Sequence, residues 1–441
     1  MNSKKWPLLL LSILVLISCM GCRKNPEIDA KIPIEFWTSD TEQDRIETQQ
    51  QLADRFSKKF PKYQVKIIGV QEDLLPQRLA AYKAGGRLPE VVRIGMEYTS
   101  GYVDDNLLDT KTAGEVISEL GEDSFFSGPL QLLKHGNKDY AAVPIDGWGQ
   151  CIWYRKDWFE SKNLEPPSSW RTLLLAAETF HKPAQQIYGI VLGTDPQQIY
   201  TQQTFEHLAL SNGLYLFNSA GEFNPNSRRL QETLSFYKQL AAFCPPGNNS
   251  WREARKYYLT ERAAMIFYSP YIVDDIAGFA DDHQPTENLA RHTDLVSALK
   301  GPHGDLALYG QIESLGITPI QDEAKRQAAK EWVKYLLTEG YLDVCFMSPG
   351  GKVPIRKHVV TRWQSHKYFS LYPPGLAERL AQAMDDIERW GWTLGHRSPL
   401  ITDIYGQKLF PALLGELLED KIKIEDAPEW LNKRVNRITT K

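Results

Sequence analysis

Aromatic and acidic side chains stand together at three points where a predicted strand ends. These groups are Trp37, Asp40 and Glu42; Glu97 and Tyr98; and Asp146 and Trp148. An aromatic ring offers a flat apolar face and a carboxylate accepts hydrogen bonds, so each group suits a ring that has C–H faces and a rim of hydroxyls. Since α/β sheets bind ligands beyond the carboxyl ends of their strands, we expect the three groups to line one cleft.

A structural interpretation stands beside the binding one for several of these residues. Trp37 could instead fill the core, because aromatic side chains often do so. Asp40 could serve only as the N-cap of a following helix. Trp148 is flanked by two glycines, which favours a turn at the cleft.

No recognisable catalytic or metal-binding motif accompanies these groups. The sequence lacks G-x-S-x-G, H-E-x-x-H and a P-loop, and its nine histidines have no metal-ligand spacing. We therefore expect no catalytic residue, no metal and no cofactor. A glycoside-acting enzyme needs only two carboxylates about 5 to 9 Å apart, so an anchored enzyme stays open as an alternative.

Length and charge narrow the classes of function. A chain of 441 residues exceeds one ordinary domain, and 42% hydrophobic with 24% charged residues is globular composition. The net charge of -4 gives no basic surface for nucleic acid. No cluster of cations marks the predicted cleft either, which favours a neutral ligand.

The N-terminus has the pattern of an export signal. Residues 7–18 are uncharged, follow two lysines and are too few to span a bilayer, which takes about 20 residues. Leu16–Cys19 resembles a bacterial lipobox, which predicts a signal peptide over 1–18 and acylation of Cys19. Acylation of Cys22, an ordinary cleaved signal and a short anchor are the alternatives. The polar stretch within 19–32 predicts a flexible tether. We expect an exported protein, lipid-anchored to the bacterial cell membrane and facing the periplasm or the exterior.

The remaining cysteines do not form a recognisable framework. Cys151, Cys244 and Cys345 are far apart and lack CxxC spacing. Buried free thiols are therefore predicted, although a disulfide between two of them stays open.

Strands and helices alternate along most of the chain, which predicts parallel βαβ units. The predicted strands are 33–37, 63–70, 89–94, 140–145, 151–154, 188–192, 263–268 and 315–319. The predicted helices are 42–60, 74–84, 170–180, 227–243, 251–261 and 322–337, and the C-terminal third is predicted mostly helical.

Seven segments, in order, resemble the extracellular solute-binding proteins of the maltose-binding type, which deliver sugars to ABC importers. They are IEFWTS at 34–39, FSKKFPKYQVKI at 56–67, LAAYKAGGRLPEVVRIG at 79–95, DYAAVPIDGWGQCIWYRKDWFE at 139–160, RAAMIFYSPY at 262–271, LGITPIQDEAKRQAAKEWVKYLLTEG at 315–340 and GGKVPIRKHV at 350–359. The chain departs from the family at Glu90, where Asp is usual, and at WYRKD, where Tyr-Asn-Lys is usual. The last 80 residues match by helical character alone.

The resemblance implies an α/β two-lobe fold of the type II periplasmic-binding-protein kind, with discontinuous lobes joined by a multi-strand hinge. Crossings near Val143, 294–297 and Thr338 would give an N-lobe of 33–143 plus 296–338 and a C-lobe of 144–295 plus 339–441. Such a protein would be a monomer that binds its ligand by closure of the lobes.

The resemblance also implies further site residues. Tyr271 occupies the place of a stacking aromatic, and Glu97 and Tyr98 a position that often holds sugar hydroxyls. Trp148 stands where the family is often acidic, so Asp146 could supply the acceptor. Further residues implied at the cleft are Tyr309, Gly310, Gln311, Gly350, Gly351, Lys352 and Tyr405.

The function implied is capture of a neutral carbohydrate and its delivery to the permease subunits of an ABC importer. A disaccharide-sized sugar or a small glycoside osmolyte such as glucosylglycerol, trehalose or sucrose would fit. A sensory lipoprotein that presents its ligand to a receptor is a further alternative to transport.

Overall fold

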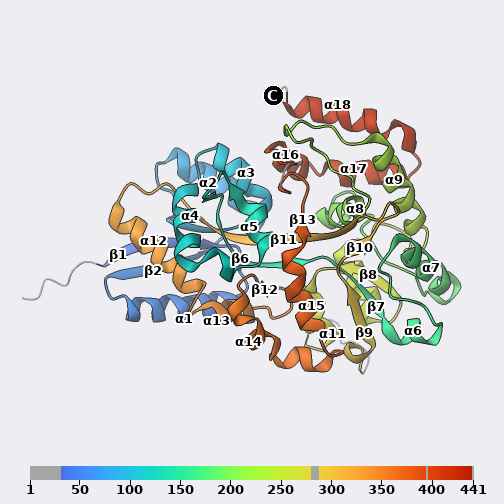
Figure 1. Cartoon of the computed structure of the whole chain (residues 1–441), viewed down its shortest axis with the longest axis horizontal. Helices are drawn as coiled ribbons and strands as arrows, with labels where there is room; N and C mark the ends of the chain where they lie inside the picture. The colour runs from blue at the N-terminus through green and yellow to red at the C-terminus, as the bar shows by residue number, and fades with distance from the viewer. Residues whose placement is uncertain (1–30, 280–287, 394–395, 440–441) are drawn as a thin grey trace, which may run out of the picture.

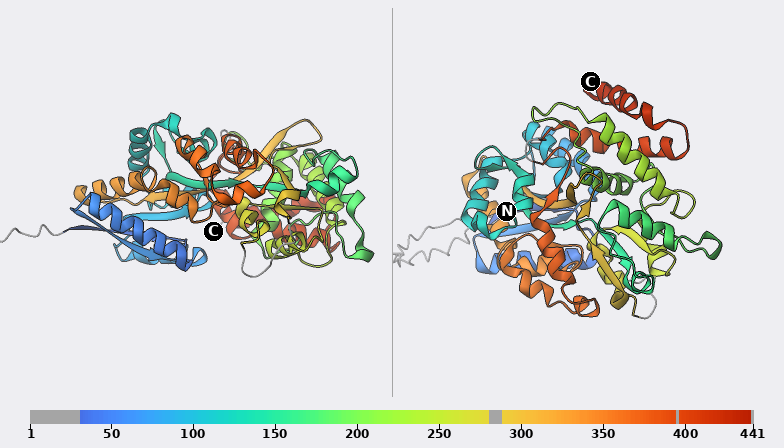
Figure 2. Two further views of the ribbon diagram at one scale, coloured as in Figure 1. Left: turned by 90° about the horizontal axis from the view of Figure 1, so that it is seen from below. Right: turned by 45° about the vertical axis from the view of Figure 1, so that its right-hand side comes forward.

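The computed structural model describes residues 31–279, 288–393 and 396–439. The predicted signal peptide, Cys19, Cys22 and residues 19–30 of the predicted tether lie outside these ranges. Two groups of elements lie side by side in Figure 1, each with a sheet of its own, and the two views of Figure 2 show the same division. Within the described residues, no helix is long and apolar enough to cross a membrane.

The larger sheet has the order β12-β6-β11-β3-β1-β2. Its first three strands in the sequence are parallel, whereas β11 runs antiparallel to both β3 and β6. β10 and β13 pair with β11 outside this path. The strands are β1 (Ile32–Thr38), β2 (Tyr63–Gly69), β3 (Val91–Gly95), β6 (Val143–Gly149), β10 (Leu299–Lys300), β11 (Leu306–Ile317), β12 (Val353–Pro354) and β13 (Ile387–Glu388).

Helices cover both faces of the parallel part of this sheet, so successive side chains of β1 are buried on opposite sides. Phe36 joins the core beneath α1 and α12, and Trp37 joins a second cluster with Leu75 and Leu79 of α2. The helices of this half are α1 (Gln43–Lys59), α2 (Leu75–Ala84), α3 (Met96–Asp104), α4 (Thr110–Leu120), α5 (Ser127–Leu133) and α12 (Glu323–Leu336).

The second half contains a three-stranded antiparallel sheet with the order β8-β7-β9. Its strands are β7 (Cys151–Arg155), β8 (Met265–Tyr268) and β9 (Thr293–Val296). The helices from its two long insertions are α6 (Lys156–Ser161), α7 (Trp170–Phe180), α8 (Ile199–Ser211), α9 (Ser227–Ala241), α10 (Trp251–Leu259) and α11 (Val273–Ile276). The helices of the C-terminal region are α13 (Tyr341–Phe346), α14 (Val360–Gln364), α15 (Leu376–Gln382), α16 (Leu400–Gly406), α17 (Leu409–Leu418) and α18 (Ala427–Thr439). Of these, α13 lies against α1 and α12 of the first half (Figure 1).

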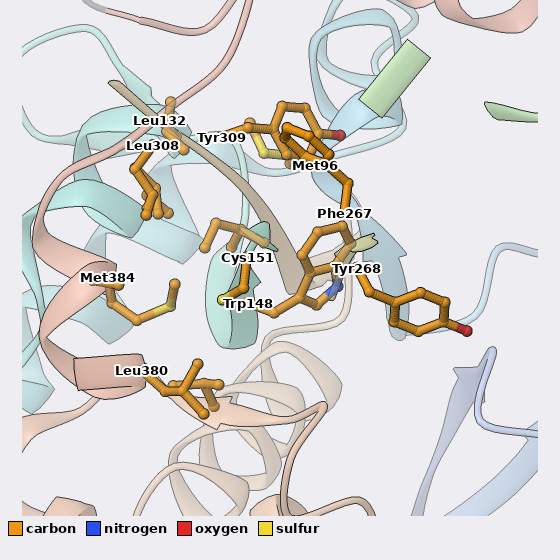
Figure 3. Packing of buried hydrophobic residues seen from close by; sticks show 14 of the residues in the cluster. Met96, Leu132, Trp148, Cys151, Phe267, Tyr268, Leu308, Tyr309, Leu380 and Met384 are labelled. Atoms are coloured by element: carbon orange, nitrogen blue, oxygen red, sulfur yellow. The ribbon is translucent and has the colours of Figure 1, made fainter. Parts of the chain in front are cut away.

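Two connections join the halves through strands. The chain leaves the larger sheet at the end of β6 and enters the smaller one at the start of β7, after the single residue Gln150. It returns between β9 and β11, and β11 is long enough to pair with β10 at one end and β3 at the other. Figure 3 shows buried side chains around this junction, among them Trp148 and Phe267. The lobe boundaries at 143, 296 and 338 stay a prediction.

Most predicted elements are present, with three notable differences. Residues 188–192 form no strand, because Tyr188 and Val191 make only isolated bridges to Ala263 and Ile266. β11 is far longer than the predicted strand 315–319, and α3, α4, α5 and α8 were not predicted. Cys151, Cys244 and Cys345 are free and buried, which confirms the prediction for these thiols.

Candidate ligand-binding site

A cleft of about 680 Å³ lies between the two halves, a volume typical of small-molecule sites. Most of the predicted site residues line it, and they come from elements far apart in the sequence. They are Asp40 and Glu42 between β1 and α1, Glu97 and Tyr98 at the start of α3, Trp148 of β6, Tyr271 after β8, Tyr309 and Gln311 of β11, and Tyr405 of α16.

One strand supplies the floor of the cleft. Tyr309, Gln311 and Glu313 alternate along β11 and all three line the cleft, since side chains two apart point to the same face of a strand. Trp148 pairs directly with Gln311 across the β6–β11 ladder and so lies on that face too. Gly310 lies between these positions and does not line the cleft; its carbonyl oxygen accepts a hydrogen bond from Arg389 instead. The flanking glycines of Trp148 lie within β6, not in a turn.

Trp37 does not face the ligand cleft, which corrects the expectation that it forms a binding plate. Its side chain is fully buried on the α2 side of the sheet. There it packs edge-on against Tyr82, with ring centroids 4.7 Å apart, and beneath the guanidinium of Arg78 at 4.8 Å. Trp37 is therefore a core residue, as the structural interpretation of the sequence proposed.

A buried network of opposite charges lies beside the cleft. Lys352 Nζ lies 2.9 Å from Asp40 and 3.5 Å from Asp146, and Arg93 Nη2 lies 2.8 Å from Asp146. Burial favours a neutral carboxyl, but Arg93 and Lys352 outweigh it and hold the pKa of Asp40 well below its usual value. Asp146 and Lys352 are fully buried and do not line the cleft, which corrects their expected role as ligand contacts. Lys352 instead forms an ion pair with Asp40, and Asp146 forms one with Arg93.

Asp40 does not cap a helix either. The N-cap of α1 is Glu42, and no side chain makes the capping hydrogen bond. The Asp40 carboxylate instead lies 3.4 Å from Arg45 and close to Lys352, with only 3% of the residue exposed at the edge of the cleft.

Gly351 leaves room for the ring of Tyr271, and Gly350 leaves room for Pro270 and Val273 on the same segment. A Cβ on Gly351 would lie 2.1 Å from the Tyr271 ring, and one on Gly350 would lie 2.4 Å from the carbonyl oxygen of Pro270. Neither glycine lines the cleft, so direct contact of their backbone with a ligand is corrected to a packing role. Tyr271 lies flat against this backbone at the wall of the cleft.

The opposite wall contains amides that the sequence analysis missed. Gln197, Gln198 and Gln203 line the cleft where α8 begins, together with Ile199. Amide groups both donate and accept hydrogen bonds and therefore suit hydroxyls. The run QQIYTQQ was visible in the sequence, but nothing local placed it at a cleft.

Arg389 is a second missed residue, and it organises the deep end of the cleft. Its Nη1 donates to Gln311 Oε1 at 2.5 Å, and its Nε lies 3.3 Å from Glu206 Oε1. Tyr405 donates its hydroxyl proton to the other oxygen of Glu206. Trp390 and Trp392 are buried in the core. Arg389, which precedes them in the sequence, lines the cleft.

The lining has no excess of positive charge. Its acidic members are Asp40, Glu42, Glu72, Glu97 and Glu313, and its basic members are Arg45, Arg93, Arg389 and Lys408. Burial raises the pKa of Glu313 to about 8; Arg93 opposes this rise, and neighbouring carboxylates reinforce it. A raised pKa favours the protonated form of Glu313, which can donate a hydrogen bond.

The sequence of this chain matches a known protein family. A family model described as bacterial extracellular solute-binding protein matches residues 40–342. The chain belongs to this family. It is 32% identical over 356 residues, 78% of each chain, to YcjN of Escherichia coli (strain K12), whose name describes an ABC transporter periplasmic-binding protein. The family and this relative are solute-binding proteins of transport.

Two solved structures share its two-lobe fold. An ABC transporter solute-binding protein from Agrobacterium radiobacter K84, in complex with ribitol, has a TM-score of 0.72 and 18% identity, covering 93% of this chain and 99% of that one. Maltose-bound T. maritima MalE3 has a TM-score of 0.71 and 19% identity, covering 92% and 99%. These likenesses confirm the expected fold class.

Proposed function

We propose that the protein is the lipid-anchored receptor of an ABC importer for a neutral carbohydrate of disaccharide size or a small glycoside osmolyte. The observation that carries the proposal is the lining of the interlobe cleft. It combines the rings of Trp148, Tyr271 and Tyr309 with amides and carboxylates, and it has no excess of positive charge. Ribitol and maltose, bound by the two structural relatives, are both uncharged polyhydroxylated molecules.

Binding would proceed by closure of the two lobes. Asp40 and Glu97 stand on one wall and Gln203 on the other, so each wall holds only part of the polar set. A ligand that contacts both walls stabilises the closed state by its additional contacts there. Hydroxyls enclosed on closure would give selectivity, because a missing partner leaves a buried polar group unpaired at a cost of about 1 to 3 kcal/mol.

Anchoring is part of the proposal. Acylation at Cys19 and a tether over the following residues would hold the receptor at the outer side of the cell membrane, within reach of the permease subunits. β1 begins at Ile32, so a tether over the preceding residues would lead directly into the sheet of the N-terminal lobe. Such a receptor would act as a monomer.

Thermal unfolding in the presence of neutral sugars tests the proposal. We expect trehalose, sucrose, glucosylglycerol or maltose to raise the unfolding temperature, because a ligand at 100 times its dissociation constant adds about 2.7 kcal/mol of stability. Trp148→Ala and Tyr271→Ala should each remove the shift while leaving the ligand-free protein folded. Unchanged affinity in both variants would refute the site. Recovery of a chemically altered sugar would instead favour the enzyme alternative.

A further inference from the structure

Arg389 is held at the deep end of the cleft by contacts on several sides. Only 1% of the residue is exposed, and its guanidinium lies 4.6 Å from the ring centroid of Tyr309 and 4.8 Å from that of Tyr405. Its Nε faces Glu206, and its Nη1 donates to Gln311 and to the carbonyl oxygen of Gly310. The planar guanidinium therefore has a fixed orientation.

This orientation also fixes the amide of Gln311. Because Gln311 Oε1 accepts from Arg389, its Nε2 must point the other way, where it donates to Glu97 Oε2 at 2.5 Å. Reversal of the amide would place a donor against the guanidinium donors and an acceptor against the carboxylate acceptor, so both hydrogen bonds would be lost. Glu97, Gln311 and Arg389 thus form a row in which acceptor and donor groups have defined positions.

Hydrogen-bonding capacity remains at both ends of the row. Arg389 Nη2 donates to none of the described residues. It is also absent from the set of fully buried polar atoms without a partner, to which Arg93 Nε belongs, so it retains some exposure. Glu97 Oε1 likewise has no hydrogen bond to a described residue, and Glu97 lines the cleft. One end of the row therefore offers N–H donors to the cleft and the other offers a carboxylate oxygen.

We propose that Arg389 is a ligand-contacting and specificity-determining residue, which with Gln311 and Glu97 recognises two adjacent hydroxyls of the bound carbohydrate. One hydroxyl oxygen accepts from Arg389 Nη2, and the neighbouring hydroxyl donates to Glu97. The inference rests on the proposed carbohydrate function. Glu206 acts through Arg389 as a positioning residue, because it balances the guanidinium charge and lies outside the cleft lining.

Replacement of Arg389 by lysine separates positioning from simple charge balance. Arg389→Lys keeps a cation for Glu206, but a single ammonium cannot occupy the Nε, Nη1 and Nη2 positions together. Arg356→Lys is the matched control, since Arg356 is also buried and donates to the carbonyl oxygens of Leu337 and Leu120 away from the cleft. The variants are compared by thermal unfolding and by calorimetric titration with trehalose, sucrose, maltose and ribitol.

We expect Arg389→Lys to weaken binding of whichever carbohydrate the wild type takes by about 10- to 100-fold, the loss of one or two charge-assisted hydrogen bonds. Arg356→Lys should lower the unfolding temperature without a change in affinity. Monodeoxy derivatives of the carbohydrate that lack either of the two hydroxyls should bind the wild type weakly, and most of the penalty for the hydroxyl that accepts from Arg389 should vanish in Arg389→Lys. Wild-type affinity in Arg389→Lys would overturn the proposal.

A measurement without ligand distinguishes failure of this inference from failure of the proposed function. In protein labelled with ¹⁵N-glutamine, the side-chain amide signal of Gln311 is identified by its absence in Gln311→Glu. We expect that signal to move in Arg389→Lys and to stay in place in Arg356→Lys. If no carbohydrate binds the wild type, the proposed function fails, and the carbohydrate assignment of Arg389 fails with it. An unmoved Gln311 signal overturns the positioning role by itself.

Discussion

Gly351→Ala is the sharpest test of how the cleft wall is built. A Cβ at this position would lie 2.1 and 2.2 Å from two carbons of the Tyr271 ring, and 2.4 Å from a third. Ordinary van der Waals contact begins near 3.4 Å, so the ring or the backbone must retreat by more than 1 Å. Since the ring forms part of the cleft wall, either movement changes the surface that a ligand meets.

The size of the effect follows from the cost of overpacking. Forcing an extra methyl group into a packed site costs about 1 to 3 kcal/mol, and we expect the ligand-free variant to lose stability by that amount. If the bound state pays a similar penalty in addition, affinity falls by about 5- to 150-fold. Chemical denaturation measures the first quantity. Calorimetric titration with the carbohydrate that stabilises the wild type measures the second.

Gly85→Ala provides the control for the change itself. A Cβ at Gly85 would meet only carbonyl oxygens at 3.6 and 3.7 Å, at the end of α2 and outside the cleft lining. This variant should be unchanged or slightly more stable, by up to about 1 kcal/mol, because alanine restricts the unfolded chain. Wild-type stability and affinity in Gly351→Ala would show that Tyr271 does not lie against this backbone.

Two further predictions concern buried charge beside the cleft. Because the pKa of Glu313 is about 8 in the fold and near 4.5 in the unfolded chain, its contribution makes the free energy of unfolding fall as pH rises from 4.5 to 8. Glu313→Gln should therefore stabilise the protein by up to about 3 kcal/mol at pH 7 and by less at pH 5. Chemical denaturation at both pH values measures these gains, and equal gains at both would contradict this pKa. Lys352→Met removes a cation shared by Asp40 and Asp146 and should cost about 3 to 5 kcal/mol in the same assay; a loss below 1 kcal/mol would show that Arg93 alone suffices for both carboxylates.

The strands and helices near the N-terminus were predictable because their patterns are local. The limits appear where a side chain's surroundings depend on distant segments. Phe36 and Trp37 are both apolar and the sheet is covered on both faces, so no polar alternation shows which of them faces which layer. The choice between core and cleft for Trp37 therefore needed the structure.

The missed and corrected site residues depend on contacts between distant parts of the chain. Asp146 and Lys352 are 206 positions apart, and Glu206 and Arg389 are 183 apart. No local pattern reveals that such charges neutralise each other in the interior. By contrast, Tyr309, Gln311 and Glu313 follow a two-residue period, and recognition of the full length of β11 would have added Glu313 to the site and removed Gly310.

β11 both supplies the floor of the cleft and runs between the two halves that the proposed closure would bring together. A substitution at Gln311 will therefore alter recognition and the bending of the receptor together, and the two effects cannot be tuned separately there. The amides at the start of α8 belong to one half only. A receptor redirected to a new sugar should be redesigned first at Gln197, Gln198 and Gln203, where the choice of cargo can change while the motion presented to the permease is preserved.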